Sequence, residues 1–333
     1  MPKESVTLIG LNDRSAWEAA TLDALPGQTW GHAAGLAEDG LVPQLAVVQA
    51  GASRMILPFH QRVFGGHVDI ATLPGLSGAL LQPDDAAPLA VWAAYAARQG
   101  WVAGYLQLSA LNGALQIGPP DRIWSHNSLF VFDLDDWDIS ASVGYKMRRN
   151  LKAGDRMGAA LVTDLPRLAG AFYPLHAGIL ARWGDVPDFS ERSVARWFAE
   201  PGIIAFGAEM GGEIVNIQIG RRCGNWADLH LAGATEAGRS LQAWVIWQAA
   251  ETLRREGVRY FNIGGYGEAG DGLHRMKARY GAAEHPLRAV LQIYDPPRFA
   301  RLCQEADADP LAAYFPPYRA RALPRAAPPA TVG

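Results

Sequence analysis

Residues 239–263, RSLQAWVIWQAAETLRREGVRYFNI, carry the pattern that decides the fold. A largely apolar helix should fill most of this stretch, stop at Gly257 and lead directly into an apolar strand. Residues 86–108, AAPLAVWAAYAARQGWVAGYLQL, show the same order, with the stop near Gly100. The two units lie about half the chain apart, which indicates a weak internal repeat and predicts two similar α/β domains in tandem. Helix, glycine and strand also follow one another in many unrelated α/β proteins.

The composition is that of a folded protein without a strong charge bias. The 333 residues are 49% hydrophobic, the formal net charge is −3 and the isoelectric point is near 6.2. This is enough apolar material for one large core or two ordinary ones. A protein that wraps duplex DNA needs a broad basic surface, which this balance excludes, although a local basic patch is compatible with it.

Targeting and metal signals are absent from the sequence. The N-terminus, MPKESVTLIGLNDRSAWEAA, lacks a signal-peptide pattern and no run reaches about 18 apolar residues, so we expect a cytoplasmic protein without a transmembrane segment. Cys223 and Cys303 are expected to be buried thiols. The histidines lack metal-ligand spacing, so we predict no metal site.

The boundaries between domains are predicted from changes in composition. We expect a helix over residues 15–24, a strand over 43–49 and a β pair within 55–74. The proline-rich stretch 117–127, IGPPDRIWSHN, suits a boundary. The predicted units are an N-terminal domain (1–125), a C-terminal domain (126–295) and an extension (296–333) with a disordered tail from about 324.

A cluster of glycines follows the second unit. Gly265, Gly267 and Gly270 spell G-x-G-x-x-G after a strand, as in a dinucleotide-binding turn. That fold needs a long apolar helix next, whereas DGLHRMKAR is short, polar and stopped by Gly281. A P-loop is excluded because no G-K-[ST] closes the glycines. We therefore interpret the spacing as coincidental.

The short helix after the glycines carries Lys277, with Asp271 near its start as a candidate N-cap. Glycines let the backbone approach a ligand closely, and a nearby ammonium could stabilise the oxyanion of an acyl-transfer intermediate. A solvated lysine on a β-to-α connection would give the same pattern.

A second cluster is the basic segment GYKMRRNLKAGDRMG, residues 144–158. Helical spacing places Arg149, Lys152 and Arg156 along one face. Such a stripe suits phosphate groups, which arginine grips with two parallel hydrogen bonds. A charged, solvent-facing helix would look alike.

The third segment is WADLHLAGATEAGRSLQAW, residues 226–244. Asp228 and His230 alternate along a strand and therefore share a face, where either could act as a base or be a satisfied polar residue within the sheet. The helix start after them could bind a pyrophosphate through its amides. The residues assigned to that cofactor-binding role are Gly238, Arg239 and Ser240.

In this order and spacing the three segments resemble the FemAB/FemX-like branch of the GNAT superfamily of acyltransferases. Residues 146–158 resemble its R-x-N-[LIV]-[RK]-x-A-x-x-x-G helix, and Gly154 is a mild departure. Residues 240–265 resemble its L-x-W … A … G-x-x-x-[FY]-[DN]-[LIV]-G-G unit. Residues 273–282 resemble its [LI]-x-x-[FY]-K-x-x-[FY]-G ending, with Met276 in place of an aromatic. MILPFHQR and Gly-Leu-Ser-Gly earlier in the chain also fit, so the resemblance spans about 45–295.

The resemblance implies an α/β (α+β) fold with two tandem GNAT-like domains, each a mixed central sheet flanked by helices, and a last strand that returns to the first domain. It implies an acyltransferase that moves an aminoacyl group from aminoacyl-tRNA, or an acyl group from acyl-CoA, onto an amine of a peptide, amino acid or nucleotide-linked acceptor. The donor would be a co-substrate, with no permanently bound cofactor. The acceptor end of a tRNA would then be a partner. The chain lacks the long helical arm with heptad repeats that some enzymes building peptidoglycan cross-bridges carry, and its net charge is acidic. Both features argue slightly against a dedicated cell-wall ligase, but they do not decide between the two donors.

By position, the resemblance makes Lys277 the residue that stabilises the transition state and places Arg148 or Arg149 in the helix that meets substrate phosphates. The sequence shows no strong general base, and a substrate phosphate, a chain of waters or Asp228, the candidate catalytic residue, could take the proton from the amine. Further residues expected to bind substrate are Lys152, Tyr266, Gly264, Gly265 and His230. A non-catalytic GNAT-like ligand-binding protein is the alternative from another class, and it would have no need of both Lys277 and the basic helix.

Overall fold

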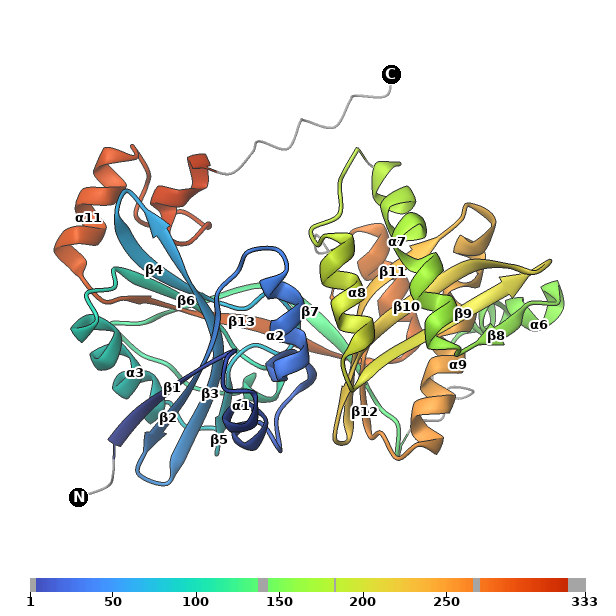
Figure 1. The fold of residues 1–333 in the computed structure, drawn as a ribbon, viewed down its shortest axis with the longest axis horizontal. Coiled ribbons are helices and arrows are strands. Elements are labelled where there is room, and N and C mark those ends of the chain that lie inside the picture. Colours follow the sequence, from blue (N-terminus) through green and yellow to red (C-terminus); the bar gives the residue numbers. More distant parts are fainter. Residues whose placement is uncertain (1–3, 137–142, 183, 266–269, 323–333) are drawn as a thin grey trace.

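The computed structural model describes residues 4–136, 143–182, 184–265 and 270–322 (Figure 1). The strands are β1 (Glu4–Gly10), β2 (Pro43–Ala50), β3 (Ser53–Phe64), β4 (His67–Thr72), β5 (Leu80–Gln82), β6 (Ala103–Gln107), β7 (Arg122–Asp133), β8 (Ala160–Val162), β9 (Ile203–Met210), β10 (Glu213–Cys223), β11 (Trp226–Ala234), β12 (Tyr260–Asn262) and β13 (Ala283–Ile293).

The helices are α1 (Arg14–Ala20), α2 (Trp30–Ala37), α3 (Ala87–Arg98), α5 (Tyr145–Leu151), α6 (Ala153–Met157), α7 (Leu165–Ala181), α8 (Glu191–Ala199), α9 (Gln242–Arg255), α10 (Gly272–Lys277) and α11 (Pro296–Glu305). Single 3-10 turns are η1 (Pro26–Gln28), η2 (Ala110–Asn112), η3 (Ala237–Leu241), η4 (Ala278–Tyr280) and η5 (Pro317–Ala322).

The strands form one mixed sheet that runs through the whole molecule. Its order is β1-β2-β3-β4-β6-β13-β7-β12-β11-β10-β9-β8, and β5 pairs with β3 beside this path. Read outward from the central β13–β7 pair, the two halves repeat each other. Each half contains one parallel pair, β4 with β6 and β11 with β12, and the other pairs are antiparallel. The repeat expected from the two helix-glycine-strand units is therefore present in the topology.

Each of those units is built as the sequence indicates. Helix α3 ends just before Gly100 and helix α9 just before Gly257, and both glycines have positive φ angles (72° and 81°). Glycine adopts this left-handed conformation without a Cβ clash and so ends the helix. Strands β6 and β12 follow within a few residues.

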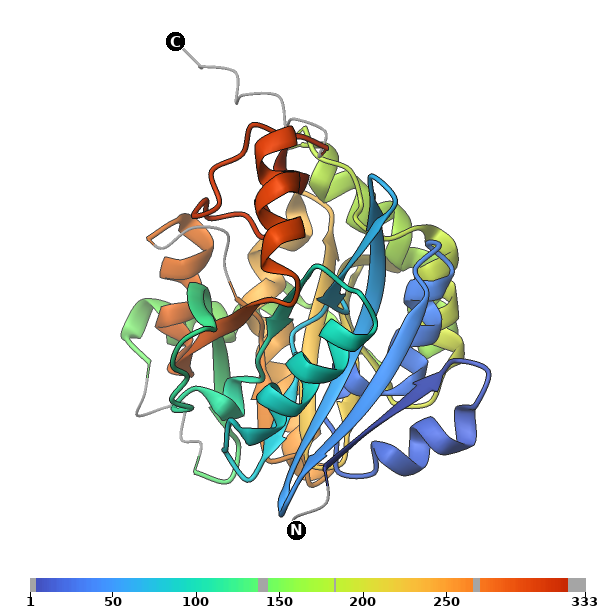
Figure 2. The same ribbon diagram turned by 90° about the vertical axis from the view of Figure 1, so that its left-hand side faces the viewer.

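The end of the chain joins the two halves. Strand β13 pairs with β6 on one side and with β7 on the other. Helix α11 then packs on the first half, where Phe299 and Leu302 share a core cluster with Val102 and Ala103. In Figure 2 both α3 and α11 lie toward the viewer, but they cover opposite faces of the sheet, because Val290 of β13 belongs to the cluster with α3 whereas Ala289 and Leu291 belong to the cluster with α11. The boundary expected after residue 125 falls within β7, and the expected tail from 324 lies outside the described residues.

Helices cover both faces of the sheet. In the second half, Ile204 and Phe206 of β9 belong to the cluster beneath α9, whereas Ala205 between them belongs to the cluster beneath α7 and α8. Alternate residues therefore face different helices, which explains why these strands are apolar on both sides. Helix α3 covers the first half in the position that α9 takes in the second.

A tight helix contact brings the halves together. Helix α2 of the first half packs on α8 of the second, where Trp197 lies so close to Gly35 that any side chain at Gly35 would clash with the indole. The indole Nε1 of Trp197 donates a hydrogen bond to the carbonyl of His32 (3.0 Å). This contact places residues of the first half beside the strands of the second.

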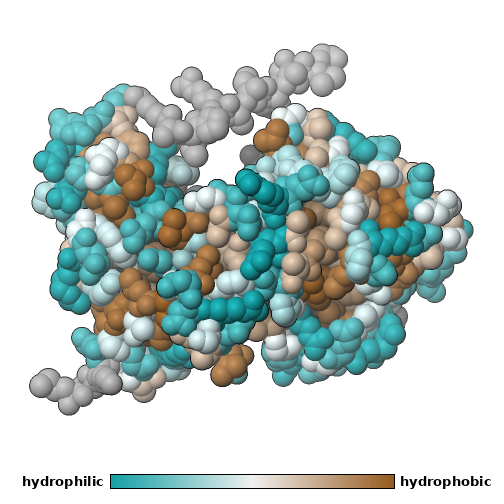
Figure 3. Space-filling model, in the orientation of Figure 1, coloured by the Kyte–Doolittle hydropathy of each residue, from teal (hydrophilic) through white to brown (hydrophobic). Residues whose placement is uncertain are grey.

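The surface view in Figure 3 shows hydrophilic side chains over much of the face, with hydrophobic patches between them. Within the described part of the chain, no helix is both long and apolar enough to span a bilayer. Cys303 is a buried free thiol and Cys223 a half-buried one.

Candidate active site

A cleft opens where two parallel strands separate. Strands β11 and β12 pair over only three positions, from Trp226 opposite Tyr260 to Asp228 opposite Asn262. Strand β11 continues to Ala234, but β12 stops, so β11 loses its neighbour on one side. The cleft beyond this point has a volume of about 540 Å³. That size is within the usual range for small-molecule sites.

The cleft is walled by β11, α9, α10 and the loop after β12. It adjoins a second hollow of about 820 Å³, and the two share Gln218, His230 and Gln242. The exposed Asp188 lines both the cleft and this second hollow, whereas Lys277 lines the cleft. The cleft therefore presents a cation, a carboxylate and neutral polar groups to a ligand.

Lys277 lies at the floor of this cleft. Its side chain is only 8% exposed, and Nζ donates hydrogen bonds to the carbonyls of Ile263 and Gly265, both at 2.6 Å. Burial lowers the pKa of Lys277 to about 8, and nearby Asp271 opposes this shift. Asp271 also caps α10, because its carboxylate accepts the amide of His274 (2.6 Å). The cap predicted at Asp271 is confirmed.

Two glycines let the loop after β12 carry the lysine. Gly264 has φ +77°, and a Cβ there would lie 3.2 Å from Lys277 Nζ. A Cβ on Gly265 would lie 2.6 Å from the carbonyl oxygen of Ser128 on β7. Only glycine fits both positions, because any other residue would push the loop away from Nζ or from β7. The loop and Lys277 thus form one unit.

Asn262 ties this loop to Asp228. The Asn262 side-chain oxygen accepts the amide of Gly264 (2.8 Å), and its Nδ2 donates to Asp228 Oδ1 (3.0 Å). Trp226 Nε1 donates to the same oxygen (2.7 Å), and Ser77 Oγ of the first half donates to Oδ2 (3.0 Å). Asp228 therefore helps to fix the loop at Gly264 and Gly265 that holds Lys277.

Asp228 is not among the residues that line the cleft. It faces a small inner cavity of about 20 Å³ at the junction of the halves. Burial raises the pKa of Asp228 to about 6, against the lowering effect of its three donors. The role of Asp228 as a proton acceptor stays a prediction, and from behind the wall of the cleft its carboxylate could receive a proton through an intervening group.

His230 lines the cleft, and its role in binding substrate stays a prediction. Its ring also borders the inner cavity, and it packs edge-on to Trp197 and His32. Burial lowers the pKa of His230 to about 4, with a further contribution from His176. The imidazole is therefore neutral at pH 7.

The proteins similar to this chain were found among solved structures. No protein-family model and no curated protein matches the chain. FemX superposes with a TM-score of 0.64 at 9% identity, covering 89% of this chain and 99% of that one. The C-terminal domain of a putative lysylphosphatidylglycerol synthetase from Agrobacterium fabrum gives 0.60 at 15% identity, covering 84% and 92%. A conserved protein of unknown function from Bacteroides thetaiotaomicron gives 0.57 at 14%, covering 87% and 100%.

The chain has the FemX fold. The predicted mixed α/β architecture with two GNAT-like halves is confirmed, and so is the resemblance in fold to the FemX-like branch. Identities of 9–15% in these three matches establish the fold and leave the chemistry to the residues of the site.

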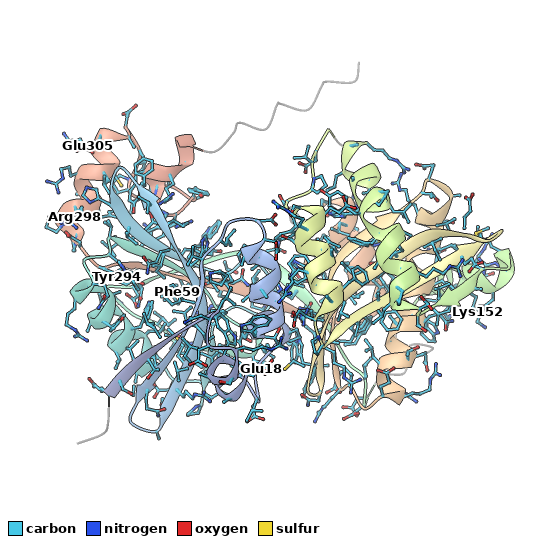
Figure 4. All side chains as sticks on the ribbon, in the orientation of Figure 1. Glu18, Phe59, Lys152, Tyr294, Arg298 and Glu305 are labelled. Carbon is cyan, nitrogen blue, oxygen red and sulfur yellow. The ribbon has the colours of Figure 1, made fainter. Side chains whose placement is uncertain are left out.

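In this FemX fold the basic segment forms helices α5 and α6 and lines a groove of its own. The groove has a volume of about 530 Å³ and is lined by Arg148, Arg149, Lys152, Tyr145, Leu151, Asp155, Trp247 and Gln248. It shares no lining residue with the cleft, because α9 lies between them and contributes different residues to each side. Figure 4 shows Lys152 at the outer edge of the second half. The predicted phosphate-binding residues are thus grouped together but lie apart from Lys277.

The predicted pyrophosphate site at the start of a helix is not formed as expected. The turn η3 precedes α9, the Gly238 amide already donates to Thr235 Oγ1 (3.0 Å), and a Cβ on Gly238 would lie 1.8 Å from the Val215 carbonyl. Ser240 Oγ donates to the carbonyl of Ala237. Arg239 lines the second hollow and pairs with Glu236, so it alone of the three reaches a ligand site. Tyr266, also predicted to bind substrate, lies outside the described residues.

Several site residues were not predicted from the sequence. Ser77 and Leu76 belong to the Gly-Leu-Ser-Gly stretch of the first half, which crosses to bond Asp228 and to line the cleft. Asn262 stands at the [DN] position of the strand motif, which was the available signal. Arg221, a buried residue of β10, gave no signal at all. Among the described residues no three potential ligands gather as a metal site would require.

Proposed function

We propose that the chain is an N-acyltransferase that moves an aminoacyl group from aminoacyl-tRNA, or an acyl group from acyl-CoA, onto an amine acceptor. The observation that carries this proposal is Lys277, a buried ammonium at the floor of an open cleft, held by the carbonyls of Ile263 and Gly265. The FemX fold and the resemblance of three sequence motifs to the FemAB/FemX-like acyltransferases support it.

The geometry of Lys277 suits stabilisation of an oxyanion. A protonated lysine has three N–H donors, and two of them are used by the loop carbonyls. The third has no acceptor among the described residues, so it can meet the negative charge that develops on the acyl oxygen in the tetrahedral intermediate. With its pKa lowered to about 8, Lys277 remains mostly protonated at pH 7. Burial fixes its position before the reaction, so little reorganisation is needed.

The acceptor amine would approach from the polar wall of the cleft. Asp188 is a carboxylate at this wall that attracts a cationic amine, and Gln218 and Gln242 offer neutral hydrogen-bonding groups beside it. The amine must lose a proton before or during attack, and holding it next to the activated carbonyl makes the reaction effectively unimolecular.

The donor would be anchored partly outside the cleft. The groove on α5 combines Arg148, Arg149 and Lys152 with the aromatic rings of Tyr145, which is 78% exposed, and Trp247. Cations that bind phosphates next to rings on which bases stack are a common arrangement for nucleotide-containing ligands. Both aminoacyl-tRNA and acyl-CoA carry such groups, so the groove fits either donor.

A donor-consumption assay tests the proposal. The protein is incubated with labelled aminoacyl-tRNA or acyl-CoA and a panel of amines, and the transferred label is measured for wild type and for Lys277→Ala. We expect one donor class to be consumed, and transfer to fall at least about tenfold in the variant. Binding of a donor without any transfer by folded wild type would instead support a non-catalytic ligand-binding protein.

A further inference from the structure

The inner cavity at the junction of the halves is lined by residues from both. Its wall includes His32 and Leu76 of the first half and Arg221, Asp228 and His230 of the second. A volume of about 20 Å³ exceeds the 10–15 Å³ or so that one water molecule needs. Most of its wall is apolar, but Arg221, Asp228 and His230 contribute polar groups, and a bound water needs about two to four such partners.

Several polar atoms here lack partners among the described residues. Arg221 is 6% exposed, and its Nη2 donates to the carbonyl of Pro201, but its Nε and Nη1 are buried without an acceptor. Nε2 of His230 is likewise buried and unpartnered. Leaving such groups unsatisfied is costly, so a water between them would stabilise the structure.

Asp228 supplies the matching acceptor. Within the described part of the chain, its Oδ1 accepts two hydrogen bonds, from Trp226 and Asn262, whereas Oδ2 accepts one, from Ser77. A carboxylate has about four acceptor positions, so one remains on Oδ2. Among the groups that line the cavity, a water would therefore find two donors, Arg221 and His230 Nε2–H, and one acceptor, Asp228 Oδ2.

His230 connects this cavity with the cleft, because its ring lines both. We propose that a buried water links His230 to Asp228 and Arg221, and that His230 accepts the proton which the amine loses during acyl transfer. This inference rests on the proposed function and selects His230 as the group that takes the proton, a choice that the sequence left open. Asp228, which does not reach the substrate, becomes the end point of the relay.

The step balances as follows. The amine nitrogen forms a bond to the acyl carbon, and the C–O or C–S bond to the donor breaks with its electron pair leaving on oxygen or sulfur. The ammonium proton passes to His230 Nδ1, Nε2–H passes a proton to the water, and the water passes one to Asp228. The leaving group takes a proton from solvent or departs as a thiolate, and Asp228 later releases its proton to solvent.

The acidities favour this direction. Burial lowers the pKa of His230 to about 4 and raises that of Asp228 to about 6, so a proton on His230 moves on to Asp228. At pH 7, before the reaction, His230 is therefore neutral and Asp228 is mostly ionised. His32 cannot compete, because its Nε2 lies 2.7 Å from the carbonyl of Pro74 and burial lowers its pKa to about 3.

The test compares His230→Gln, His230→Ala and a control, His67→Gln on β4 of the first half, using the donor that wild type consumes. We expect kcat to fall about 100-fold in both His230 variants, with KM changed less than about threefold. Added imidazole should restore part of the activity of His230→Ala but not that of His230→Gln. Thermal melting shows whether each variant is folded, and His67→Gln should match wild type.

A high-resolution crystal structure of the wild-type protein provides the second measurement. We expect a water within about 3.2 Å of His230 Nε2 and Asp228 Oδ2. An empty cavity, or unchanged kcat in folded His230→Gln, would overturn the relay while leaving the acyltransferase proposal intact. Wild-type protein that transfers no acyl group would overturn the proposed function and with it the catalytic role of His230, whereas the crystal structure would still report on the water.

Discussion

Replacing Lys277 by methionine separates its catalytic role from its structural one. Removing one oxyanion donor typically costs about 100- to 1000-fold in rate, or about 3–4 kcal/mol of transition-state stabilisation. The stability terms oppose each other. Two carbonyls lose a charged donor, at about 1.5–3 kcal/mol each, but the cost of burying the charge, about 3 kcal/mol for a pKa lowered from 10.5 to about 8, is also removed. The net loss of stability should therefore be small beside the loss of activity.

The measurement is single-turnover transfer with saturating donor and acceptor, together with urea unfolding of each protein. Lys277→Met should bind donor normally, remain folded and transfer about 100-fold more slowly or worse. Arg279→Met is the matched control, because it removes an exposed cation two residues away that does not line the cleft, and its rate should equal that of wild type. Unchanged single-turnover transfer in folded Lys277→Met would refute the oxyanion role.

The remaining predictions concern pH, phosphate binding and packing. Between about pH 8 and 10.5 the unfolded protein holds a proton on Lys277 that the folded protein has released. The free energy of unfolding of the wild type, measured with urea, should therefore rise with pH in this range relative to that of Lys277→Met. The same pH dependence in both proteins would contradict this. The double variant Arg149→Ala, Lys152→Ala should raise KM for a phosphate-bearing donor several-fold and make that KM less dependent on salt, while kcat stays the same. A fall in kcat without a change in KM would contradict a role of this groove in binding the donor. Gly238→Ala, whose Cβ would lie 1.8 Å from the Val215 carbonyl, should lose about 3 kcal/mol or more, whereas Gly178→Ala on α7, with nothing within 4 Å, should gain up to about 1 kcal/mol; equal melting temperatures would show that the loop at Gly238 relaxes freely.

Local patterns predicted the features that depend on neighbouring residues. The two helix-glycine-strand units were readable because a glycine with positive φ ends α3 and α9 and an apolar strand follows at once. Asp271 could be predicted as an N-cap because its contact, with the amide of His274, is also local in the sequence. The position of Lys277 also followed from a motif in the chain, but its 8% exposure and two carbonyl partners depend on how the loop folds back over it.

Long-range packing decided what the sequence did not reveal. Asp228 and His230 both border the inner cavity, but of the two only His230 lines the cleft, beyond the point where β12 stops and where β11 shifts its register against β10. The amide of Gly238 looked available for an anion because Thr235 Oγ1, its actual acceptor, is a neighbour only in the folded turn. Arg221 and Ser77 join the site across the junction of the halves, and no spacing in the sequence encodes that contact.

The difference between the two halves explains why the cleft lies in the second one. In both halves a pair of parallel strands separates, but in the first the backbone after β4 fills the gap, where Ala79 bridges to Leu108 and Gln107 Nε2 donates to the carbonyl of Gly75. The same segment then extends to the second half, where Ser77 bonds Asp228 and Leu76 lines the cleft. The segment after β4 thus closes the gap in the first half and also completes the site in the second half. We therefore expect neither half on its own to form the loop that holds Lys277, the inner cavity and the cleft.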